Sequence, residues 1–269
     1  MINYRYLGRL IVNPSNYLFP KHILAKADPE RALVDKFVSS LENAKTGDLL
    51  LDAGAGNFRF KKLLEDKGYV YESQDFTEVF DEVSRGKHTY VCDIVNIPVE
   101  SSRFDVVVCI QVLEHLSDPH AAFREFARIL KPGGVLVLTT NFLFPIHGAP
   151  YDFFRFTSFG LKSLCESSGF APLLVIPRGG FFALTAKIIY DLPAIIKSWL
   201  FFGSANPHGP SKIELKSPLV ILPLLPLVFL LDLTCTFLAF VISNLDFLDK
   251  KNRFTLGYAL RATSFQKVK

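Results

Sequence analysis

The sequence predicts an α/β fold in which a doubly wound, mainly parallel sheet is joined to a hydrophobic helical insertion. Short apolar runs of strand length alternate with segments of helical periodicity as far as residue 169. The run at 104–110 is apolar on both faces, which is typical of a parallel strand covered by helices on both sides. After residue 180 the composition changes, and apolar residues dominate.

Composition and charge narrow the classes of function. The chain has 269 residues, 49% of them hydrophobic, which argues against intrinsic disorder. A net charge of +4 is too small and too evenly spread for a nucleic-acid-binding surface. The four cysteines lie far apart without a CxxC pair, so no metal site is predicted. The N-terminus lacks the apolar run of a secretory signal, which predicts a cytosolic or cytosol-facing chain.

The first predicted elements lead into a glycine turn. Asp28 is expected to cap a helix that begins at Pro29 and carries apolar residues at helical spacing up to Leu41. The apolar run at 48–51 is a buried strand that enters the turn at 52–57. The other elements expected in this half are a helix at 59–66 and strands at 69–71 and 88–92.

The second half continues the alternation of strand and helix. After the strand at 104–110, Asp118 begins a helix that the sequence KPGG at 131–134 ends. A buried strand follows at 135–139, and Thr157 is expected to cap a helix at 161–168. This alternation implies right-handed crossovers in a doubly wound sheet.

The glycine turn predicts a nucleotide-type pocket. Gly54 and Gly56 lack a Cβ, so the backbone can approach a ligand closely, and the next helix offers unpaired N–H groups. The dinucleotide pattern GxGxxG would need glycine where this chain has Arg59, which weakens NAD binding. Asp52, ahead of the glycines, favours a cationic ligand over a pyrophosphate. A turn that serves packing alone is the simpler alternative.

Five segments in a fixed order extend this interpretation. They are LLLDAGAGNF at 49–58, QDF at 74–76, CDIVNIP at 92–98, FDVVVCIQVLEHL at 104–116 and REFARILKPGGVLVLTT at 124–140. On these motifs, over about residues 45–175, the sequence resembles the class I S-adenosylmethionine-dependent methyltransferases, in particular the methyltransferase type 11 group. The resemblance implies a Rossmann-like methyltransferase sheet that ends in an antiparallel hairpin, with S-adenosylmethionine as the cofactor.

The resemblance also assigns cofactor-binding residues. It implies that Asp52, Gly54 and Gly56 line the methionine and ribose part of the cofactor. Asp75 would accept hydrogen bonds from the ribose hydroxyls, with Glu72 as the rival for that role.

Further along the chain, the resemblance implies that Asp93 holds the adenine amino group while Ile94 packs on the ring. Gln111 would border the methionine end. For these residues, an ordinary turn position is the alternative. Phe58 departs from the pattern, because many members of the family have a third glycine there; the cofactor still fits if the Phe58 side chain turns toward the core.

Candidate acceptor-side residues follow two strand ends. Methyl transfer from a sulfonium is an in-line displacement, which needs alignment and, for a hydroxyl acceptor, a base. His115 and His147 are the candidate bases, and each has a structural histidine as its alternative. Tyr151, Asp152 and Arg155 are expected to position the acceptor; alternatively, Asp152 and Arg155 pair across one helical turn and Tyr151 is a hydrophobic lid.

The region after residue 180 predicts a membrane-associated insertion. Residues 218–243 contain one charge, Asp232, and are long enough to cross a hydrocarbon core of ~30 Å. The prolines at positions 218, 223 and 226 argue against a straight helix. A second apolar stretch at 181–202 is interrupted by Lys187, Asp191 and Lys197.

The terminal hairpin constrains how this insertion meets a membrane. Its halves are predicted at 171–176 and 254–262, on either side of the apolar region. If they pair, both ends of the insertion lie on one side of the membrane, so a single crossing is excluded. Two crossings, a re-entrant hairpin and interfacial helices stay open, and the charges and prolines favour the last two. A soluble cap or dimer interface is the non-membrane alternative.

The sequence therefore predicts a methyltransferase domain at 1–180, a membrane-associated helical insertion at 181–250 and a last strand at 251–269. The predicted enzyme uses S-adenosylmethionine at the cytoplasmic face of a membrane, or in the cytoplasm. Its acceptor is expected to be small and amphiphilic or lipid-linked, such as a polyprenyl-linked glycan or a quinone precursor. The alternative is a noncatalytic interaction protein that docks through its apolar insertion. A homo-oligomer stays open, and no nucleic-acid partner is expected.

Overall fold

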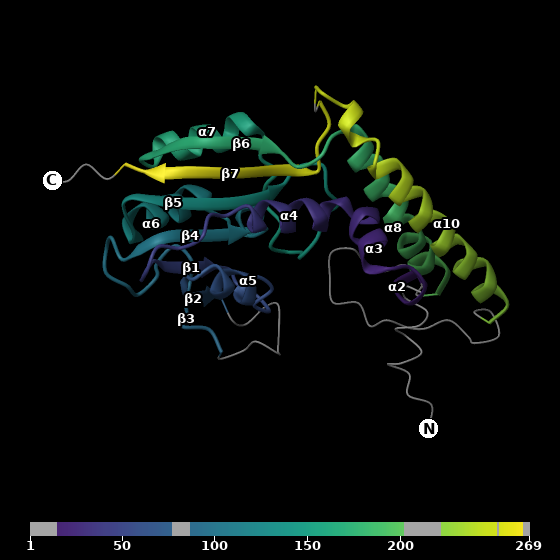
Figure 1. Ribbon diagram of the computed structural model, residues 1–269, viewed down its shortest axis with the longest axis horizontal. Helices are drawn as coiled ribbons and strands as arrows, with labels where there is room; N and C mark the ends of the chain where they lie inside the picture. The colour runs from purple at the N-terminus through teal and green to yellow at the C-terminus, as the bar shows by residue number, and fades with distance from the viewer. Residues whose placement is uncertain (1–14, 77–86, 202–221, 252, 266–269) are drawn as a thin grey trace. The chain divides into compact units, whose positions relative to one another are not determined.

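A computed structural model describes residues 15–76, 87–201, 222–251 and 253–265 (Figure 1). The chain forms two compact units. The sheet unit consists of residues 34–144, 151–178 and 257–269, and the helical unit of residues 1–33, 145–150 and 179–256. The chain thus leaves the sheet unit twice and returns to it for its last strand. Residues 202–221 of the predicted insertion lie outside the described residues.

The sheet unit contains a seven-stranded sheet in the order β3-β2-β1-β4-β5-β7-β6. The strands are β1 Leu49–Ala53, β2 Val70–Asp75, β3 Tyr90–Val91, β4 Phe104–Ile110, β5 Leu130–Asn141, β6 Phe170–Pro177 and β7 Gly257–Ser264. The first five pair in parallel, whereas β7 is antiparallel to both β5 and β6. This arrangement confirms the predicted doubly wound sheet and its terminal antiparallel hairpin.

Two strand predictions need correction. The strand expected at 88–92 is only two residues long in β3. The strand expected at 135–139 is longer, because β5 begins at Leu130 and includes the KPGG segment at 131–134, where the register shifts between Phe104 and Val106 on the partner strand. The preceding helix ends at Ile129, directly before this segment, as predicted. The backbone is folded so tightly there that a Cβ on Gly134 would lie 2.9 Å from the Lys131 carbonyl oxygen. Glycine therefore allows an irregularity inside the strand instead of ending it.

Helices cover both faces of the sheet. They are α4 Pro29–Ser39, α5 Lys61–Asp66, α6 Pro119–Ile129 and α7 Ser158–Ser167. Two of the three predicted caps are confirmed: an Asp118 side-chain oxygen accepts from Ala121 N at 2.9 Å, and Thr157 Oγ1 accepts from Gly160 N at 3.1 Å. The cap at Asp28 stays a prediction, although the helix does begin at Pro29.

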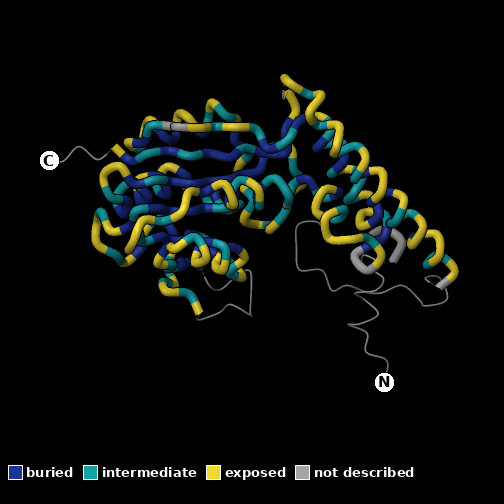
Figure 2. Tube along the Cα trace, viewed as in Figure 1, coloured by how far each residue is buried: buried dark blue, intermediate teal, exposed yellow. Residues whose placement is uncertain are grey.

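The core of the sheet unit has two layers, one on each side of the sheet. Figure 2 shows the strands between them as mostly buried. In β4, Val107 and Cys109 pack with residues of α6 and α7, while Val106 and Val108 pack with residues of α4 and α5. Successive side chains of one strand therefore enter opposite layers, as the apolar run at 104–110 predicts. The two layers hold the carboxyl ends of the parallel strands along one edge.

The helical unit is built around two long helices. It contains α2 Ser15–Leu18, α3 Lys21–Ala27, α8 Phe181–Phe201 and α10 Leu225–Ser243, with 3-10 turns at Leu222–Leu224 and Asp246–Leu248. α8 and α10 lie side by side, and α3 packs against α10. Pro223 and Pro226 lie before or within the first turn of α10, where a missing N–H costs little, so they begin this helix instead of breaking it.

Candidate active site at the carboxyl edge of the sheet

The predicted cofactor residues lie at the carboxyl ends of β1, β2 and β4 in the sheet unit. Gly54 N donates to the Gln74 carbonyl oxygen at 2.9 Å, which ties the glycine turn to β2. A Cβ on Gly54 would lie 2.4 Å from Val112 Cγ2, which places the turn against the residue after Gln111. The carboxyl edge of an open α/β sheet is where such folds bind ligands. The fold thus gathers Asp52, Gly54, Gly56, Asp75 and Gln111 in one region.

The two glycines of the turn meet different surroundings. Both have positive φ angles, +74° at Gly54 and +52° at Gly56. A side chain on Gly54 would collide with Val112, whereas a Cβ on Gly56 would have no atom within 4 Å. Gly54 is therefore required by packing, and Gly56 borders open space that a ligand can enter.

This contrast gives a paired prediction. Gly54→Ala is expected to destabilise the fold by about 2 kcal/mol or more, because a steric clash is added to backbone strain. Gly56→Ala is expected to cost only about 1 kcal/mol but to weaken cofactor binding more than tenfold, because its methyl group occupies ligand space. Thermal unfolding and cofactor titration of both variants test this. Equal effects of the two variants on unfolding would contradict it.

Asp52 is a buried acid whose charge is costly. It is 3% exposed, and Tyr71 donates its hydroxyl hydrogen to Asp52 Oδ2 at 2.8 Å. Burial raises the pKa of Asp52 to about 7, and the nearby charge of Asp75 adds to the rise. A carboxyl group with a pKa near 7 at a ligand-binding edge is typical of a functional site. A cation bound beside Asp52 would favour the ionised form of its carboxyl group.

Asp75 and its rival Glu72 have different partners. Asp75 Oδ2 accepts from Gly56 N at 2.6 Å, so this acid lies directly beside the glycine turn. Glu72 accepts from the Tyr90 hydroxyl at 2.7 Å and forms an ion pair with Arg103 at 2.6 Å. The structure thus places Asp75 at the candidate site and occupies Glu72 in a separate polar cluster. The ribose-binding role of Asp75 stays a prediction.

The adenine-side residues lie in the turn after β3. Asp93 is exposed, and one of its oxygens accepts from Val95 N at 3.1 Å. Ile94 is 4% exposed and belongs to the core layer on the α6 side. Gln74, which sequence reasoning missed, connects this turn to the glycine turn: its Nε2 donates to Cys92 O at 2.6 Å and its Oε1 accepts from Gly54 N at 3.2 Å.

Two non-glycine residues at this edge have left-handed backbones. Phe58 has φ +61°, and its ring stacks on His88 with centroids 4.5 Å apart, so it does not turn toward the core as expected. The fit of the cofactor therefore rests on the open space at Gly56, not on the orientation of Phe58. Gln111 has φ +59°, and its Nε2 donates to Thr139 Oγ1 at 3.0 Å. Positive φ angles outside glycine carry strain and cluster at functional sites. Strained backbone therefore lies on both sides of the predicted pocket, at Phe58 and at Gln111.

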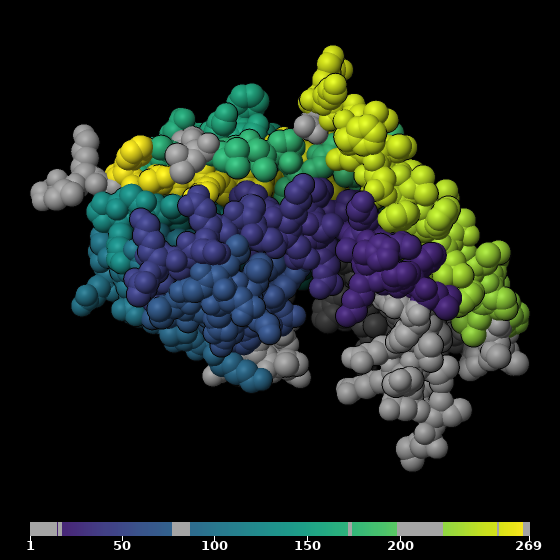
Figure 3. All heavy atoms as spheres, viewed as in Figure 1, coloured from purple at the N-terminus to yellow at the C-terminus, as the bar shows by residue number. Residues whose placement is uncertain are grey.

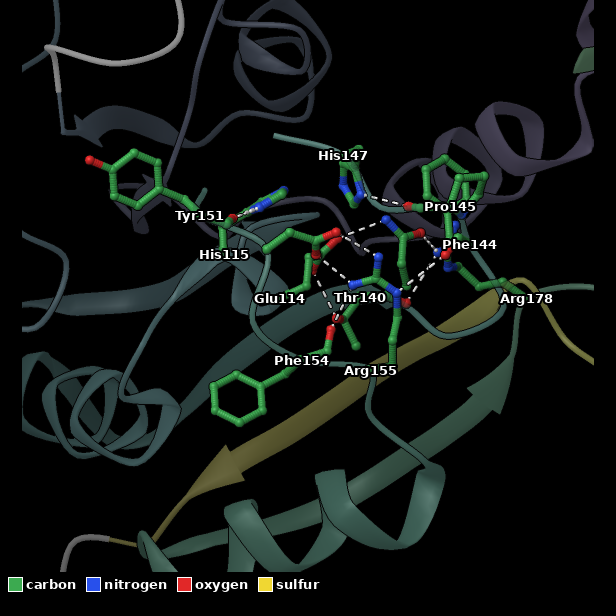
Figure 4. A network of polar contacts seen from close by, with 12 residues as sticks. Glu114, His115, Thr140, Phe144, Pro145, His147, Tyr151, Phe154, Arg155 and Arg178 are labelled. Carbon is green, nitrogen blue, oxygen red and sulfur yellow. Dashed lines mark hydrogen bonds and ion pairs between the residues drawn. The ribbon is translucent and has the colours of Figure 1, made fainter. Parts of the chain in front are cut away.

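A buried polar network lies next to this edge, centred on Glu114, which sequence reasoning did not single out (Figure 4). Glu114 is fully buried and accepts from Thr140 Oγ1 and Asn141 Nδ2, each at 2.8 Å. Arg178, 2% exposed, donates from Nη2 to the Thr140 carbonyl oxygen at 3.1 Å and to Asn141 Oδ1 at 2.9 Å. The network fixes the end of β5 to the segment after β4.

The loop after residue 150 carries the predicted Asp152–Arg155 pair. Arg155 Nη1 and Nη2 donate to the two Asp152 carboxylate oxygens at 2.6 and 2.8 Å. This bidentate bond raises the pKa of Arg155, despite its partial burial. The predicted pair is confirmed, but the helical turn expected to carry it is wrong, because residues 152–157 have no regular secondary structure. The pair braces an irregular loop.

His115 contacts the same loop. Its Nδ1 lies within hydrogen-bonding distance of the Tyr151 carbonyl oxygen (Figure 4). A carbonyl oxygen only accepts, so Nδ1 carries the hydrogen and the lone pair of the neutral ring is on Nε2. The Tyr151 ring is 42% exposed and is followed by the exposed rings of Phe153 and Phe154. The sheet unit thus places an imidazole and an aromatic loop beside its carboxyl edge.

His147 belongs to the helical unit, in the segment 145–150. Its Nδ1 lies 3.2 Å from the Pro145 carbonyl oxygen of the same segment. Its role as a base stays a prediction.

Comparisons with known proteins agree with this geometry. Residues 51–138 match a family model described as a methyltransferase domain. The ubiquinone biosynthesis O-methyltransferase of Coxiella burnetii (strain Dugway 5J108-111) is 30% identical over 155 residues, which are 52% of this chain and 63% of that protein. The match therefore spans less than two thirds of that relative's length.

Solved structures resemble the fold at lower identity. The [4+2]-cyclase SpnF has a TM-score of 0.52 at 19% identity, covering 88% of this chain and 82% of its own. The Haemonchus contortus phosphoethanolamine N-methyltransferase 2, in complex with S-adenosylhomocysteine, has a TM-score of 0.51 at 14% identity, covering 88% of this chain and 53% of its own. This chain therefore carries a methyltransferase domain, and its sheet unit has the class I S-adenosylmethionine-dependent methyltransferase fold.

Proposed function

We propose that this chain is an S-adenosylmethionine-dependent methyltransferase whose acceptor is a small amphiphilic or lipid-linked molecule, of glycan or quinone type, at a membrane surface. The observation that carries the proposal is the cluster at the carboxyl edge of the sheet. There, Gly56 borders open space and donates its N–H to Asp75, next to the buried Asp52.

These residues fit the cofactor. Open space at Gly56 allows the cofactor to approach the backbone closely. The carboxyl group of Asp52 suits the cationic part of the cofactor, and that of Asp75 suits the two ribose hydroxyls. When bound, S-adenosylmethionine supplies an electrophilic methyl group. Asp75, Asp93 and Ile94 would hold its nucleoside part, and Asp52 and Gln111 would lie at its methionine part. The chain's own residues would then bind the cofactor, orient it toward the acceptor and exclude water from the site.

The acceptor class rests on three observations. The loop after β5 exposes Tyr151, Phe153 and Phe154, whose rings suit an apolar or aromatic acceptor. The curated relative is named for ubiquinone biosynthesis, which makes a quinone-type phenol a first acceptor to test. The helical unit has one helix long and apolar enough to cross a membrane, among the residues that the structure describes.

A hydroxyl acceptor must lose a proton, and His115 is suited to receive it. The contact of Nδ1 with the Tyr151 carbonyl oxygen holds the ring in the tautomer that accepts at Nε2. His147 is the second candidate base. Asp152 and Arg155 brace the loop that presents the aromatic rings, so they act by positioning it.

Calorimetric titration with S-adenosylhomocysteine tests the cofactor site. The detergent-purified protein is expected to bind with micromolar affinity, and Asp75→Ala and Asp93→Ala to weaken binding at least tenfold, because each removes a polar contact to the ligand. Glu100→Ala, which removes an exposed acid of the sheet unit, is the matched control. Labelled S-adenosylmethionine is then offered with membrane lipid extract to detect the acceptor.

Two outcomes would overturn the proposal. Absence of S-adenosylhomocysteine binding by the folded wild type would favour a noncatalytic interaction protein. Binding of the cofactor with transfer only to water-soluble acceptors would retain the methyltransferase and remove the amphiphilic acceptor.

A further inference from the structure

The outward side of the two long helices is almost entirely apolar. Among the described side chains of α8 and α10, every exposed residue is apolar except Thr234. Ile188 is 59% exposed, Leu230 60% and Phe237 54%. A helix of a water-soluble unit turns its polar side outward, so this pattern is reversed.

The charges of these helices lie on the inner side and pair with one another. Lys197 and Asp232 are both buried, with Nζ and Oδ1 3.5 Å apart, and Asp232 Oδ2 also accepts from Ser15 N at 2.8 Å. Lys187 forms ion pairs with Asp191 at 2.8 Å and with Asp28 at 3.7 Å. Ionisable residues of membrane-embedded helices face the bundle interior and pair in this way.

Two threonine hydroxyls on these helices are satisfied within their own helix. Thr234 Oγ1 donates to the Leu230 carbonyl oxygen at 2.8 Å, and Thr185 Oγ1 donates to the Phe181 carbonyl oxygen at the same distance. In a hydrocarbon environment no water is present to satisfy such groups, so internal partners are required. The one exposed polar side chain, Thr234, therefore needs no solvent partner for its hydrogen.

Length and exposure match a bilayer. The segment Leu225–Leu248 has a mean hydropathy of 2.3, and only 28% of its most apolar window is buried within the protein. A core helix of a soluble protein would be mostly buried. α8 has 21 residues, which at a rise of 1.5 Å gives about 30 Å, close to the thickness of a hydrocarbon core.

A basic and aromatic turn follows the apolar segment. Lys250, Lys251 and Arg253 line an open hollow of about 430 Å³ together with Phe181 and Phe254, whose ring centroids are 6.0 Å apart. Lys and Arg next to the end of a membrane helix attract anionic headgroups, and aromatic rings lie at the same depth. The turn thus supplies an interfacial end for the helix pair.

We propose that α8 and α10 insert as an antiparallel hairpin into the hydrocarbon core of an anionic lipid bilayer, with the basic turn at 249–254 among the headgroups. In Figure 3 the side chains of α10 form a continuous surface along the helical unit, drawn in yellow-green. This surface would contact acyl chains. The inference shares with the proposed function only its membrane surface, so cofactor binding and membrane insertion can be tested apart.

Flotation of the full chain with phosphatidylcholine–phosphatidylglycerol vesicles tests the insertion. The wild type is expected to float and to resist extraction by alkaline carbonate. The double variant Leu230→Lys/Phe237→Lys is expected to stay at the bottom of the gradient, because it places two charges on the outer side. The matched control Leu174→Lys/Phe159→Lys changes exposed residues of the same types in the sheet unit and is expected to float.

The basic turn is tested by Lys250→Glu/Lys251→Glu/Arg253→Glu. Loss of the three cations alone is expected to weaken partition into anionic vesicles about a hundredfold, at about fivefold for each residue, and the three added carboxylates weaken it further by repulsion. S-adenosylhomocysteine binding is measured on every variant and is expected to be unchanged, which separates a folding defect from lost insertion.

Two results would overturn the hairpin proposal. One is a wild type that stays soluble as a dimer which Leu230→Lys/Phe237→Lys dissociates, because a second copy would then cover this surface. The other is release of the wild type by carbonate, which indicates peripheral attachment. Lack of S-adenosylhomocysteine binding with intact insertion would instead contradict the proposed function alone.

Discussion

Binding of S-adenosylmethionine is expected to strengthen up to tenfold per pH unit between pH 5 and pH 7 and to level off above pH 7. Burial raises the pKa of Asp52 to about 7, so its carboxyl group is mostly protonated at pH 5. A cationic ligand gains from the carboxylate, not from the neutral acid, so binding below pH 7 must release a proton. Calorimetry in two buffers of different ionisation enthalpy measures that release.

Asp52→Asn is the matched variant for this prediction. Asparagine keeps an acceptor for the Tyr71 hydroxyl but cannot ionise, so the pH profile of binding is expected to become flat. A pH-dependent affinity that persists in Asp52→Asn would contradict the assignment.

The same substitution changes stability with a definite sign. The folded pKa of about 7 lies above the usual aspartate pKa of 3.8, so between these two pH values the native state keeps a proton that the unfolded chain loses. The wild type therefore loses up to about 4 kcal/mol of stability as pH rises through the window, and Asp52→Asn avoids that loss. Urea unfolding is expected to show a gain of the variant at both pH 5 and pH 8, and a gain about 2–3 kcal/mol larger at pH 8, because the unfolded chain has already lost most of this proton at pH 5.

Glu114→Ala is expected to destabilise the protein by about 3–5 kcal/mol. The fully buried carboxylate accepts from Thr140 Oγ1 and Asn141 Nδ2, and its removal leaves two buried donors without their acceptor and a cavity beside them. Urea unfolding followed by near-ultraviolet circular dichroism measures the change.

Two milder variants are expected to lower the free energy of unfolding by less than Glu114→Ala. Thr140→Val removes the hydroxyl donor and leaves no unsatisfied donor at that position, so the free energy of unfolding is expected to fall by about 1 kcal/mol. Glu114→Gln keeps the shape but turns one acceptor into a donor facing another donor, so an intermediate loss is expected. A Glu114→Ala protein as stable as the wild type would show that the network contributes nothing.

The fold was largely predictable because its signals are local. The strand at 104–110 alternates its side chains between two core layers, and Asp118 and Thr157 cap helices as their sequence context predicts. The strand predicted at 135–139 was placed too short, since no local rule shows that β5 also includes the KPGG segment that follows the end of α6. Pairing with β4 and β7 decides how far β5 extends.

The candidate site was only partly predictable because its polar partners lie far apart in sequence. Gln74 bridges to Cys92 and Gly54, and Glu114 meets Asn141 across 27 positions. Nothing near either residue in the sequence indicates such a partner. Glu114 could have been suspected from the acid in LEHL, which directly follows a strand end.

In the apolar region after residue 180, ion pairs formed in the folded structure change the interpretation of the charged residues. Lys187 and Lys197 argue against a membrane-embedded helix when the sequence is considered alone. In the structure, Lys197 contacts Asp232, 35 positions away, and Lys187 contacts Asp28, which lies between α3 and α4. The charges thus neutralise one another on the inner side, which only tertiary packing shows.

The position of β7 between β5 and β6 gives the protein a required order of biogenesis. β7 lies between β5 and β6, yet its residues are synthesised after the whole helical hairpin. Until residue 264 has left the ribosome, β5 and β6 lack the strand that joins them, and their edges are open to wrong pairing. A truncation before Gly257 would therefore leave β5 and β6 without the strand that pairs with both, so the sheet is completed only by residues made after the helices α8 and α10.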